Sequence, residues 1–202
     1  MTDMILRSAG PSPFVRKVRM TAEVLGLTDR IALDMADVTD PKDTLLSQNP
    51  LGKVPALVLK DGTVVYDSCV IVEHLDQAAG GGIVIPEGAE RIAELRLQAL
   101  ADGMMDAGIL QIYERRYRPE DKHHEPWVEL QAQKVARALT ALEADPPARH
   151  TPPRIGEIAV AAILGYLDFR FDGTWRTDHP KLVAWLDQFA KDVPAFDMTA
   201  PE

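Results

Sequence analysis

A serine held between two prolines is the first feature of the sequence that could do chemistry. Ser12 lies between Pro11 and Pro13, directly before a run, "PFVRKVRM", whose apolar residues have the spacing of a helix. A hydroxyl at the start of a helix lies beside unpaired backbone N–H groups and the positive end of the helix dipole, which together favour a negatively charged ligand. The alternative is that Ser12 only caps its own helix, and this segment alone leaves both interpretations open.

A proline at the front of a predicted strand is the second such feature. In "NPLGKVPALV", Pro55 cannot donate a hydrogen bond within a sheet, so the strand must begin at or after it. A cis bond between Val54 and Pro55 costs only about 0.5–1 kcal/mol, and it would turn the main-chain N–H and C=O of Val54 outward. Those groups could then pair with the main chain of a bound peptide. An ordinary turn is the alternative.

An acid and a hydroxyl open a further predicted helix, in "YDSCVIVEHL", directly after a strand. The start of a helix suits a carboxylate, and Asp67 suits an ammonium group. Asp67 and Ser68 together therefore match the two charges of an amino-acid head. Taken singly, an Asp-Ser pair before a helix is ordinary capping chemistry.

The chain around these motifs predicts an α/β domain followed by an all-helical one. Residues 1–80 alternate in the order βαβαββα, with strands in "MILRSA" and "RIALDMA" and a hairpin in "VPALVLKDGTVVYD". A short helix is expected in "TDPKDTLLSQNP", capped by Asp40 with Pro41 in its first turn. After a linker at residues 81–90, residues 91–202 are typical of amphipathic helices, with a buried one in "IGEIAVAAILGYLDFRF".

The composition narrows the classes of function. The chain has 202 residues, a formal net charge of −9 and one cysteine, Cys69, which is expected to be a small core residue. A nucleic-acid partner is disfavoured because phosphate binding needs a basic surface. A single cysteine permits no internal disulfide, which favours a reducing cytoplasm. No secretory signal is expected, no metal because the histidines lack ligand spacing, and no membrane span because the longest apolar run, Ile158 to Leu167, is too short.

In their order and spacing, "SPFVRKV", "NPLGKVPAL" and "DSCVIVEHL" resemble motifs of the glutathione S-transferase superfamily, in its bacterial serine-type cytosolic branch. "LADGMMDAG" and "IGEIAVAAILGYLDFR" in the helical half agree, so the resemblance covers nearly the whole chain. It implies a thioredoxin-like first domain that binds glutathione and a helical domain that lines the pocket of a second substrate. It also implies a cytoplasmic homodimer with a role in detoxification.

The resemblance implies a role for each motif. Ser12 would hydrogen-bond the glutathione sulfur, and Val54 would pair with the cysteinyl main chain. Asp67 and Ser68 would hold the γ-glutamyl end. Lysines would meet the glycyl carboxylate, and they are needed because the negative net charge repels an anionic tripeptide. The implied glutathione-binding residues are Ser12, Lys42, Lys53, Val54, Pro55, Asp67 and Ser68.

The implied reaction is transfer of glutathione to an electrophilic, largely apolar co-substrate. The nucleophile is the thiolate, and lowering a thiol pKa from about 8.5 to about 6.5 requires roughly 2.7 kcal/mol. A hydrogen bond from Ser12 to the charged sulfur contributes about 1.5–3 kcal/mol, and the helix N-terminus adds about 0.3–1 kcal/mol. Arg16, one turn further on, is a further candidate source of positive charge. The alternatives are a glutathione-dependent peroxidase and a glutathione-binding or structural module without catalysis.

The long predicted helix supplies candidates for the co-substrate pocket. Methionines and aromatic rings at helical spacing ordinarily belong to a core, and an adaptable apolar wall with one polar member is the alternative. The candidate pocket residues are Met104, Met105, Asp106, Tyr113 and Tyr117.

The start of the buried helix departs from the pattern of the family. Its members usually have Ser or Thr there, followed three residues later by Asp, whereas this chain has Arg154 and Glu157. Arg154 cannot accept a hydrogen bond from a backbone N–H. The lost cap predicts a helical domain weakened by about 1 kcal/mol, unless Thr151 caps the helix instead.

Overall fold

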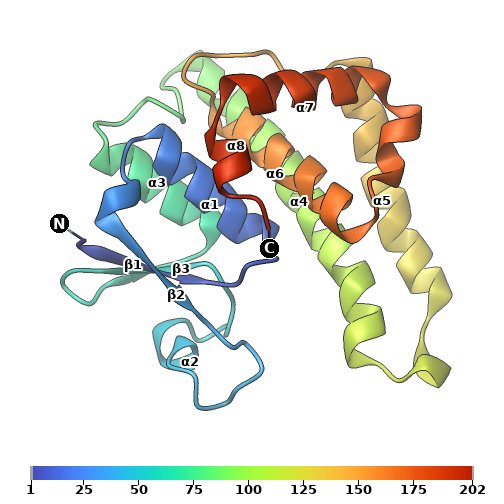
Figure 1. Ribbon diagram of the computed structural model, residues 1–202, viewed down its shortest axis with the longest axis horizontal. Helices are drawn as coiled ribbons and strands as arrows, with labels where there is room; N and C mark the ends of the chain where they lie inside the picture. Colours follow the sequence, from blue (N-terminus) through green and yellow to red (C-terminus); the bar gives the residue numbers. More distant parts are fainter. Residues whose placement is uncertain (1, 202) are drawn as a thin grey trace.

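The structure is a computed structural model that describes residues 2–201, in which an α/β unit lies beside a helical unit (Figure 1). The order of elements in the first unit confirms the predicted βαβαββα arrangement. The elements are β1 (Met4–Ser8), α1 (Pro13–Val24), β2 (Ile31–Met35), α2 (Leu45–Gln48), β3 (Ala56–Leu59), β4 (Val64–Val65) and α3 (Ser68–Ala78). A 3₁₀ turn at Thr28–Arg30 leads into β2.

In the described residues, four strands form one mixed sheet in the order β2-β1-β3-β4. β1 runs parallel to β2, as a strand–helix–strand order favours, and antiparallel to β3, which in turn is antiparallel to β4. α1 and α3 cover one face of the sheet, and the segment that contains α2 lies on the opposite side (Figure 1). Met4 and Leu6 of β1 are buried in the core, whereas Ile5 between them is 42% exposed, because successive residues of a strand face opposite sides.

Three connections meet at one edge of this sheet. Pairing of Arg7 with Ala56 places the end of β1 beside the start of β3. Pairing of Leu57 with Val65 places the end of β4 there as well. The loops before α1, before β3 and before α3 therefore converge, and these loops carry the three motifs of the sequence.

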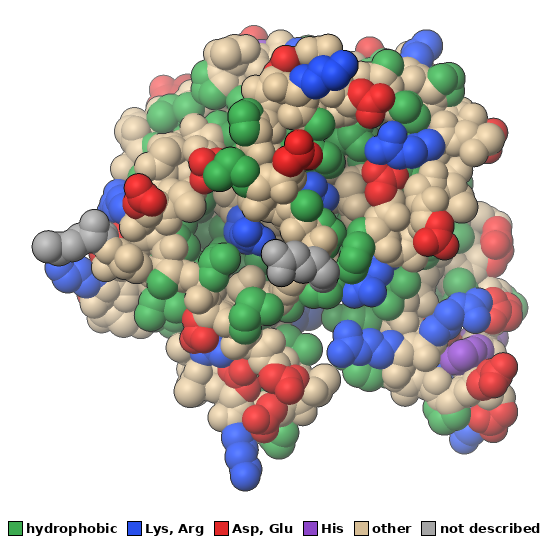
Figure 2. Space-filling view, viewed as in Figure 1, with side chains coloured by type: hydrophobic (Ala, Val, Ile, Leu, Met, Phe, Trp, Pro, Cys, Tyr) green, Lys and Arg blue, Asp and Glu red, His purple; other side chains and the backbone are tan. Residues whose placement is uncertain are grey.

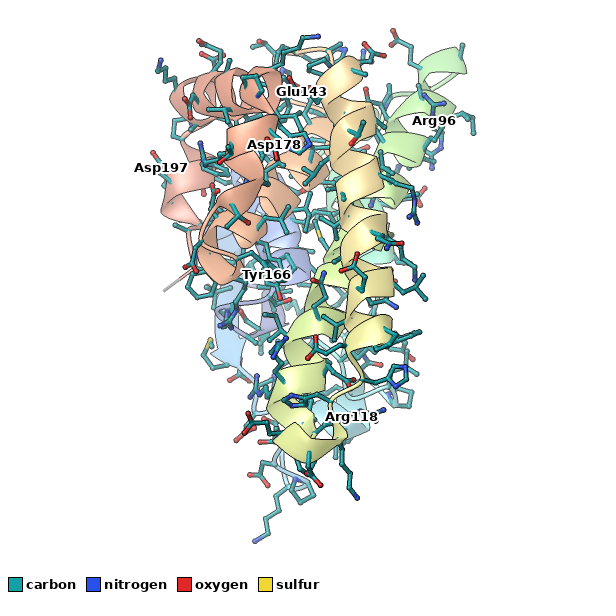
Figure 3. All side chains as sticks on the ribbon, turned by 90° about the vertical axis from the view of Figure 1, so that its right-hand side faces the viewer. Arg96, Arg118, Glu143, Tyr166, Asp178 and Asp197 are labelled. Carbon is teal, nitrogen blue, oxygen red and sulfur yellow. The ribbon has the colours of Figure 1, made fainter. Side chains whose placement is uncertain are left out.

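The helical unit is built around one buried helix, α6. The helices are α4 (Ala89–Tyr117), α5 (Glu125–Ala144), α6 (Ile155–Arg170), α7 (Pro180–Asp192) and α8 (Ala195–Met198). Residues 155–167 of α6 are all buried, which confirms the prediction for this segment, and α6 packs against both α4 and α1. Figure 3 shows Glu143 at the end of α5 nearest α7, where its carboxylate accepts hydrogen bonds from the backbone N–H groups of Lys181 and Leu182 at 3.0 and 2.9 Å. Within residues 2–201, no helix combines the length and apolar character needed to cross a bilayer.

The short helix after β2 begins later than predicted. α2 starts at Leu45 with Thr44 at its N-cap position, so Asp40 does not cap it and Pro41 is not in its first turn. The Asp40 carboxylate instead accepts a hydrogen bond from the backbone N–H of Lys42 at 2.8 Å, closing a local turn. Asp-Pro in this segment therefore marks a turn rather than the start of the helix.

The start of α6 is stabilised by a neighbour that the sequence pattern does not indicate. Glu157 accepts a hydrogen bond from the N–H of Arg154 at 2.9 Å, which is half of a capping box. The missing half is replaced by Glu94 of α4, whose carboxylate accepts from the N–H of Gly156 at 3.1 Å. Thr151 is exposed and lies four residues before the helix, so the alternative cap was wrong. Because Glu94 supplies the acceptor, the predicted weakening of the helical unit loses its physical basis.

Candidate functional site

Ser12 caps α1 and keeps a proton to donate. Its backbone is extended, with φ −75° and ψ 120°, and its Oγ accepts a hydrogen bond from the N–H of Val15 at 3.3 Å. Because a hydroxyl can accept with a lone pair while it donates its proton, the capping bond leaves the O–H available to a ligand in front of the helix. The capping and binding interpretations of Ser12 are therefore compatible.

Val54 offers its main chain at the same edge of the sheet. The Val54–Pro55 bond is cis, one of the two alternatives that the sequence left open, and β3 begins directly after it at Ala56. Pro55 is buried, whereas Val54 is only half-buried. Within residues 2–201, no hydrogen bond involves the main-chain N–H or C=O of Val54. These two groups can therefore pair with an extended peptide.

Asp67 and Ser68 begin α3 as the sequence predicts. Asp67 is the N-cap residue, and its Oδ1 accepts a hydrogen bond from the N–H of Cys69 at 3.1 Å. The side chain of Asp67 remains exposed, while Ser68 is 2% exposed. The carboxylate thus presents negative charge to solvent at a helix start, a combination that suits an ammonium group and a carboxylate side by side.

The two lysines of the predicted glycyl subsite lie on the segment between β2 and β3. Lys42 and Lys53 are both exposed. In Figure 2 this segment projects from the lower edge of the molecule, and a hollow separates it from the lower ends of α4 and α5. Burial raises the pKa of the Asp106 carboxyl in α4, and the positive charge of Lys53 partly opposes this rise.

The predicted co-substrate residues divide into two groups. Met104 and Met105 are 2% and 0% exposed and belong to the hydrophobic core, so they present no surface to a ligand. Asp106, Tyr113 and Tyr117 are exposed, and the two tyrosine rings meet edge to face with centroids 5.0 Å apart. The candidate wall of the co-substrate pocket is therefore aromatic and acidic. Met104 and Met105 are core residues, which is the alternative that the sequence left open for them.

Comparison with known proteins agrees with this architecture. Residues 11–78 match the family model described as "Glutathione S-transferase, N-terminal domain", and residues 125–188 match the corresponding C-terminal domain. An Escherichia coli K12 protein described as "Uncharacterized GST-like protein YibF" is 32% identical over 196 residues, covering 94% of this chain and 95% of that one. The chain belongs to the glutathione S-transferase family.

Solved structures of other members share the fold. A glutathione transferase family member from Pseudomonas fluorescens Pf-5, solved with bound glutathione, is 42% identical with a TM-score of 0.91, covering 98% of this chain and 99% of that one. A glutathione S-transferase from Methylobacillus flagellatus, also solved with glutathione bound, is 36% identical with a TM-score of 0.88 and covers 98% of this chain and all of that one.

In this glutathione S-transferase, Arg16 does not face the start of α1. Its guanidinium donates to the carbonyl of Phe196 at 2.8 Å and lies over the Phe196 ring, 4.2 Å from the centroid. A Cβ at Gly165 of α6 would lie 2.1 Å from Arg16 Nη1, so only glycine admits this packing. Burial lowers the pKa of Arg16 to about 10, which still leaves it charged at neutral pH. Arg16 therefore docks α8 onto α1, and the suggestion that it assists the thiolate is not supported by its contacts.

A polar cluster next to the start of α3, made of Lys17, Cys69, Gln98 and Asp102, was not predicted from the sequence. Lys17 of α1 is 0% exposed, and its Nζ lies 2.7 Å from both carboxylate oxygens of Asp102 in α4. The Cys69 thiol donates to Asp102 at 3.1 Å and accepts from Gln98 at 3.2 Å. The signal that could have indicated this cluster is Lys17, a charged residue among the buried residues of α1.

Cys69 is exposed rather than a core residue, so that prediction was wrong. Partial burial of the sulfur, reinforced by Asp102 and opposed by Lys17, raises the pKa of its thiol to about 11. A thiol that is protonated at neutral pH is a poor nucleophile, so Cys69 does not compete with a thiolate activated at Ser12.

In the part of the chain that the structure describes, no group of three or more His, Cys, Asp or Glu residues could hold a metal ion.

A hollow of about 450 Å³ lies outside this site, between the ends of α4 and α5, where Figure 3 labels Arg118. The residues that line this hollow are Glu114, Arg118, His124, Pro126, Trp127 and Leu130.

Proposed function

We propose that this chain binds glutathione at the edge where the three loops converge and activates its thiol for attack on an electrophilic co-substrate. The observation that carries the proposal is Ser12, whose hydroxyl is anchored by Val15 and still has a proton to donate. The glutathione found in solved relatives at 36–42% identity supports the choice of ligand.

Ser12 acts as a hydrogen-bond donor and not as a base. A donor held at a helix start stabilises the thiolate relative to the thiol, which lowers the thiol pKa. The hydrogen bond contributes about 1.5–3 kcal/mol and the helix N-terminus about 0.3–1 kcal/mol. Their sum, about 1.8–4 kcal/mol, brackets the roughly 2.7 kcal/mol that a pKa shift of two units requires.

The polar groups of the loops support a proposal for the remaining glutathione contacts. The unpaired main chain of Val54 would bind the cysteinyl residue as a short added strand. Asp67 would pair with the α-ammonium group of the γ-glutamyl end, and Ser68 with its carboxylate. Lys42 and Lys53 would neutralise the glycyl carboxylate.

The second substrate would lie against the exposed face of α4. Tyr113 and Tyr117 supply an apolar surface with polar edges, and Asp106 adds a carboxyl whose pKa is raised by burial. This wall suits an aromatic or otherwise flat electrophile. In the reaction, the glutathione sulfur forms a bond to the electrophilic carbon with its electron pair, and the leaving group departs with the pair of the broken bond.

Two assays test the proposal on the full-length chain. Calorimetry should detect glutathione binding, and a panel of electrophiles should be consumed with a rate that falls sharply on Ser12→Ala. Consumption of peroxide but of no electrophile would favour the peroxidase alternative, and binding without turnover would favour the non-catalytic module. We also propose a cytoplasmic homodimer, as in the family, which light scattering would contradict if the chain is monomeric at micromolar concentration.

A further inference from the structure

The segment between β2 and β3 has little apolar surface to hold it in place. Of residues 36–53, only Leu45 and Asn49 are buried. The segment projects away from the rest of the α/β unit (Figures 1 and 2). Because hydrophobic burial is so limited here, the position of the segment depends on its polar contacts with the sheet.

Arg7 of β1 provides those contacts. Its side chain is 4% exposed. Nη1 donates to Thr44 Oγ1 and to Gln48 Oε1, the latter at 2.9 Å. Nη2 donates to Asp43 Oδ1 at 2.7 Å, and Nε lies 3.4 Å from a carboxylate oxygen of Asp34 on the neighbouring strand. One buried guanidinium therefore joins the central strand of the sheet to three side chains of the projecting segment.

The contacts continue from Arg7 to both ends of the segment. Asp43 also accepts hydrogen bonds from the backbone N–H groups of Leu45 at 2.7 Å and Asp37 at 2.8 Å. These bonds, with the charge of Arg7, lower the pKa of Asp43. Asn49, next to the tethered Gln48, donates from Nδ2 to the carbonyl of Lys53 at 2.8 Å.

We propose that Arg7 is a positioning residue for the glycyl end of glutathione, acting through the segment that carries Lys42 and Lys53. The inference rests on the proposed function, since those lysines are the proposed partners of the glycyl carboxylate. Arg7 lies beneath the segment in the sheet and acts on the ligand only by fixing where the lysines stand. A segment that must be ordered during binding lowers affinity by the entropy of that ordering.

The consequence is a selective effect on one end of the ligand. Loss of the Arg7 guanidinium, and with it the hydrogen bonds to the segment, should weaken binding of glutathione. Binding of γ-glutamylcysteine, which lacks the glycyl residue, should remain nearly unchanged. The γ-glutamyl and cysteinyl contacts come from α3 and from Val54, which Arg7 does not touch.

The test compares both ligands by calorimetry on the full chain. Arg7→Lys keeps a cation but removes the planar fork that reaches three partners at once. We expect about tenfold weaker binding of glutathione and less than twofold change for γ-glutamylcysteine. Arg30→Met is the matched control, because Arg30 pairs with Asp3 at 2.9 Å on the surface of the same unit, away from the segment.

A second variant guards against misfolding of the sheet. Thr44→Val combined with Gln48→Leu removes two partners of Arg7 from the segment side and leaves β1 intact, and it should show the same selectivity. Equal weakening of both ligands, or of neither, in variants of a chain that binds glutathione normally would overturn the role of Arg7. Failure of the unaltered chain to bind either ligand would instead overturn the proposed function.

Discussion

Replacing Ser12 by alanine removes two interactions at once, and their magnitudes differ. The hydroxyl's donation to the thiolate contributes about 1.5–3 kcal/mol. At 1.36 kcal/mol per pKa unit, its loss should raise the pKa of the bound glutathione thiol by about one to two units. The capping bond to Val15 is long, at 3.3 Å, so its loss should cost at most about 1 kcal/mol of folding stability.

The two losses can be separated by substitutions that keep one and remove the other. Ser12→Asp retains a capping side chain, but a carboxylate cannot donate to a thiolate and repels it. Ser12→Thr retains both the cap and the donor. We therefore expect Ser12→Thr to resemble the unaltered chain, and Ser12→Asp to fold normally while losing more thiolate than Ser12→Ala.

The assay is the ultraviolet absorbance of the thiolate, measured against pH with glutathione bound at saturation. A lowered thiol pKa means that thiolate, and with it the rate, rises with pH through that pKa. In Ser12→Ala the whole rise should move to higher pH by about one to two units, and the rate at pH 6.5, where about half of the normal thiol is ionised, should fall about 5- to 50-fold. If Ser12→Asp keeps the thiol pKa of the unaltered chain, the donor explanation is refuted.

Four further predictions concern the surroundings of the site. Asp67→Ala should weaken glutathione binding by roughly 2 kcal/mol, and an unchanged dissociation constant by calorimetry would exclude its proposed role. Lys17→Met should lower the free energy of unfolding in urea by about 3 kcal/mol, because it leaves Asp102 without its cation, and adding Asp102→Leu should recover part of the loss. Cys69 should be alkylated about 100-fold more slowly in the folded chain than in urea at pH 8, since partial burial raises its pKa and keeps it protonated until the pH nears 11, and equal rates would contradict this effect of burial. Glu94→Ala should cost about 1–2 kcal/mol of stability, whereas Glu94→Gln, which keeps an acceptor, should retain most of it.

The parts of the site that could be predicted from sequence are those set by adjacent residues. A cap such as Ser12 or Asp67 depends on the few residues that follow it, and the meaning of Pro55 depends on the strand that begins beside it. Sequence order then places the three loops at one edge, because a βαβ unit and a hairpin leave few ways to arrange four strands. Because the local motifs and the order of the elements point to the same edge of the sheet, the fold and the three motifs could be predicted together.

The buried charges could not be predicted, because their partners are distant in sequence. Arg7 reaches side chains 36 to 41 residues away, and Lys17 reaches Asp102 across 85 residues. On β1 alone, Arg7 shares a face with the exposed Ile5, and on α1 alone nothing next to Lys17 indicates its partner. Cys69 was misplaced for a related reason: its position in α3 is local, but what its thiol contacts is decided by α4.

The start of α6 shows how a local rule can fail while the physics behind it holds. The capping rule calls for a side-chain hydrogen-bond acceptor at the N-cap position, because a buried backbone N–H without a partner is costly. Arg154 cannot serve, yet the N–H of Gly156 is satisfied by Glu94, 62 residues earlier on α4. The same Glu94 oxygen would lie 2.7 Å from a Cβ at position 156, so the carboxylate approaches this closely because the residue is glycine. The lack of a side-chain cap at Arg154 is therefore tolerated because Gly156 lets Glu94 of the neighbouring helix reach the backbone. This contact makes the folding of α6 depend on its packing against α4.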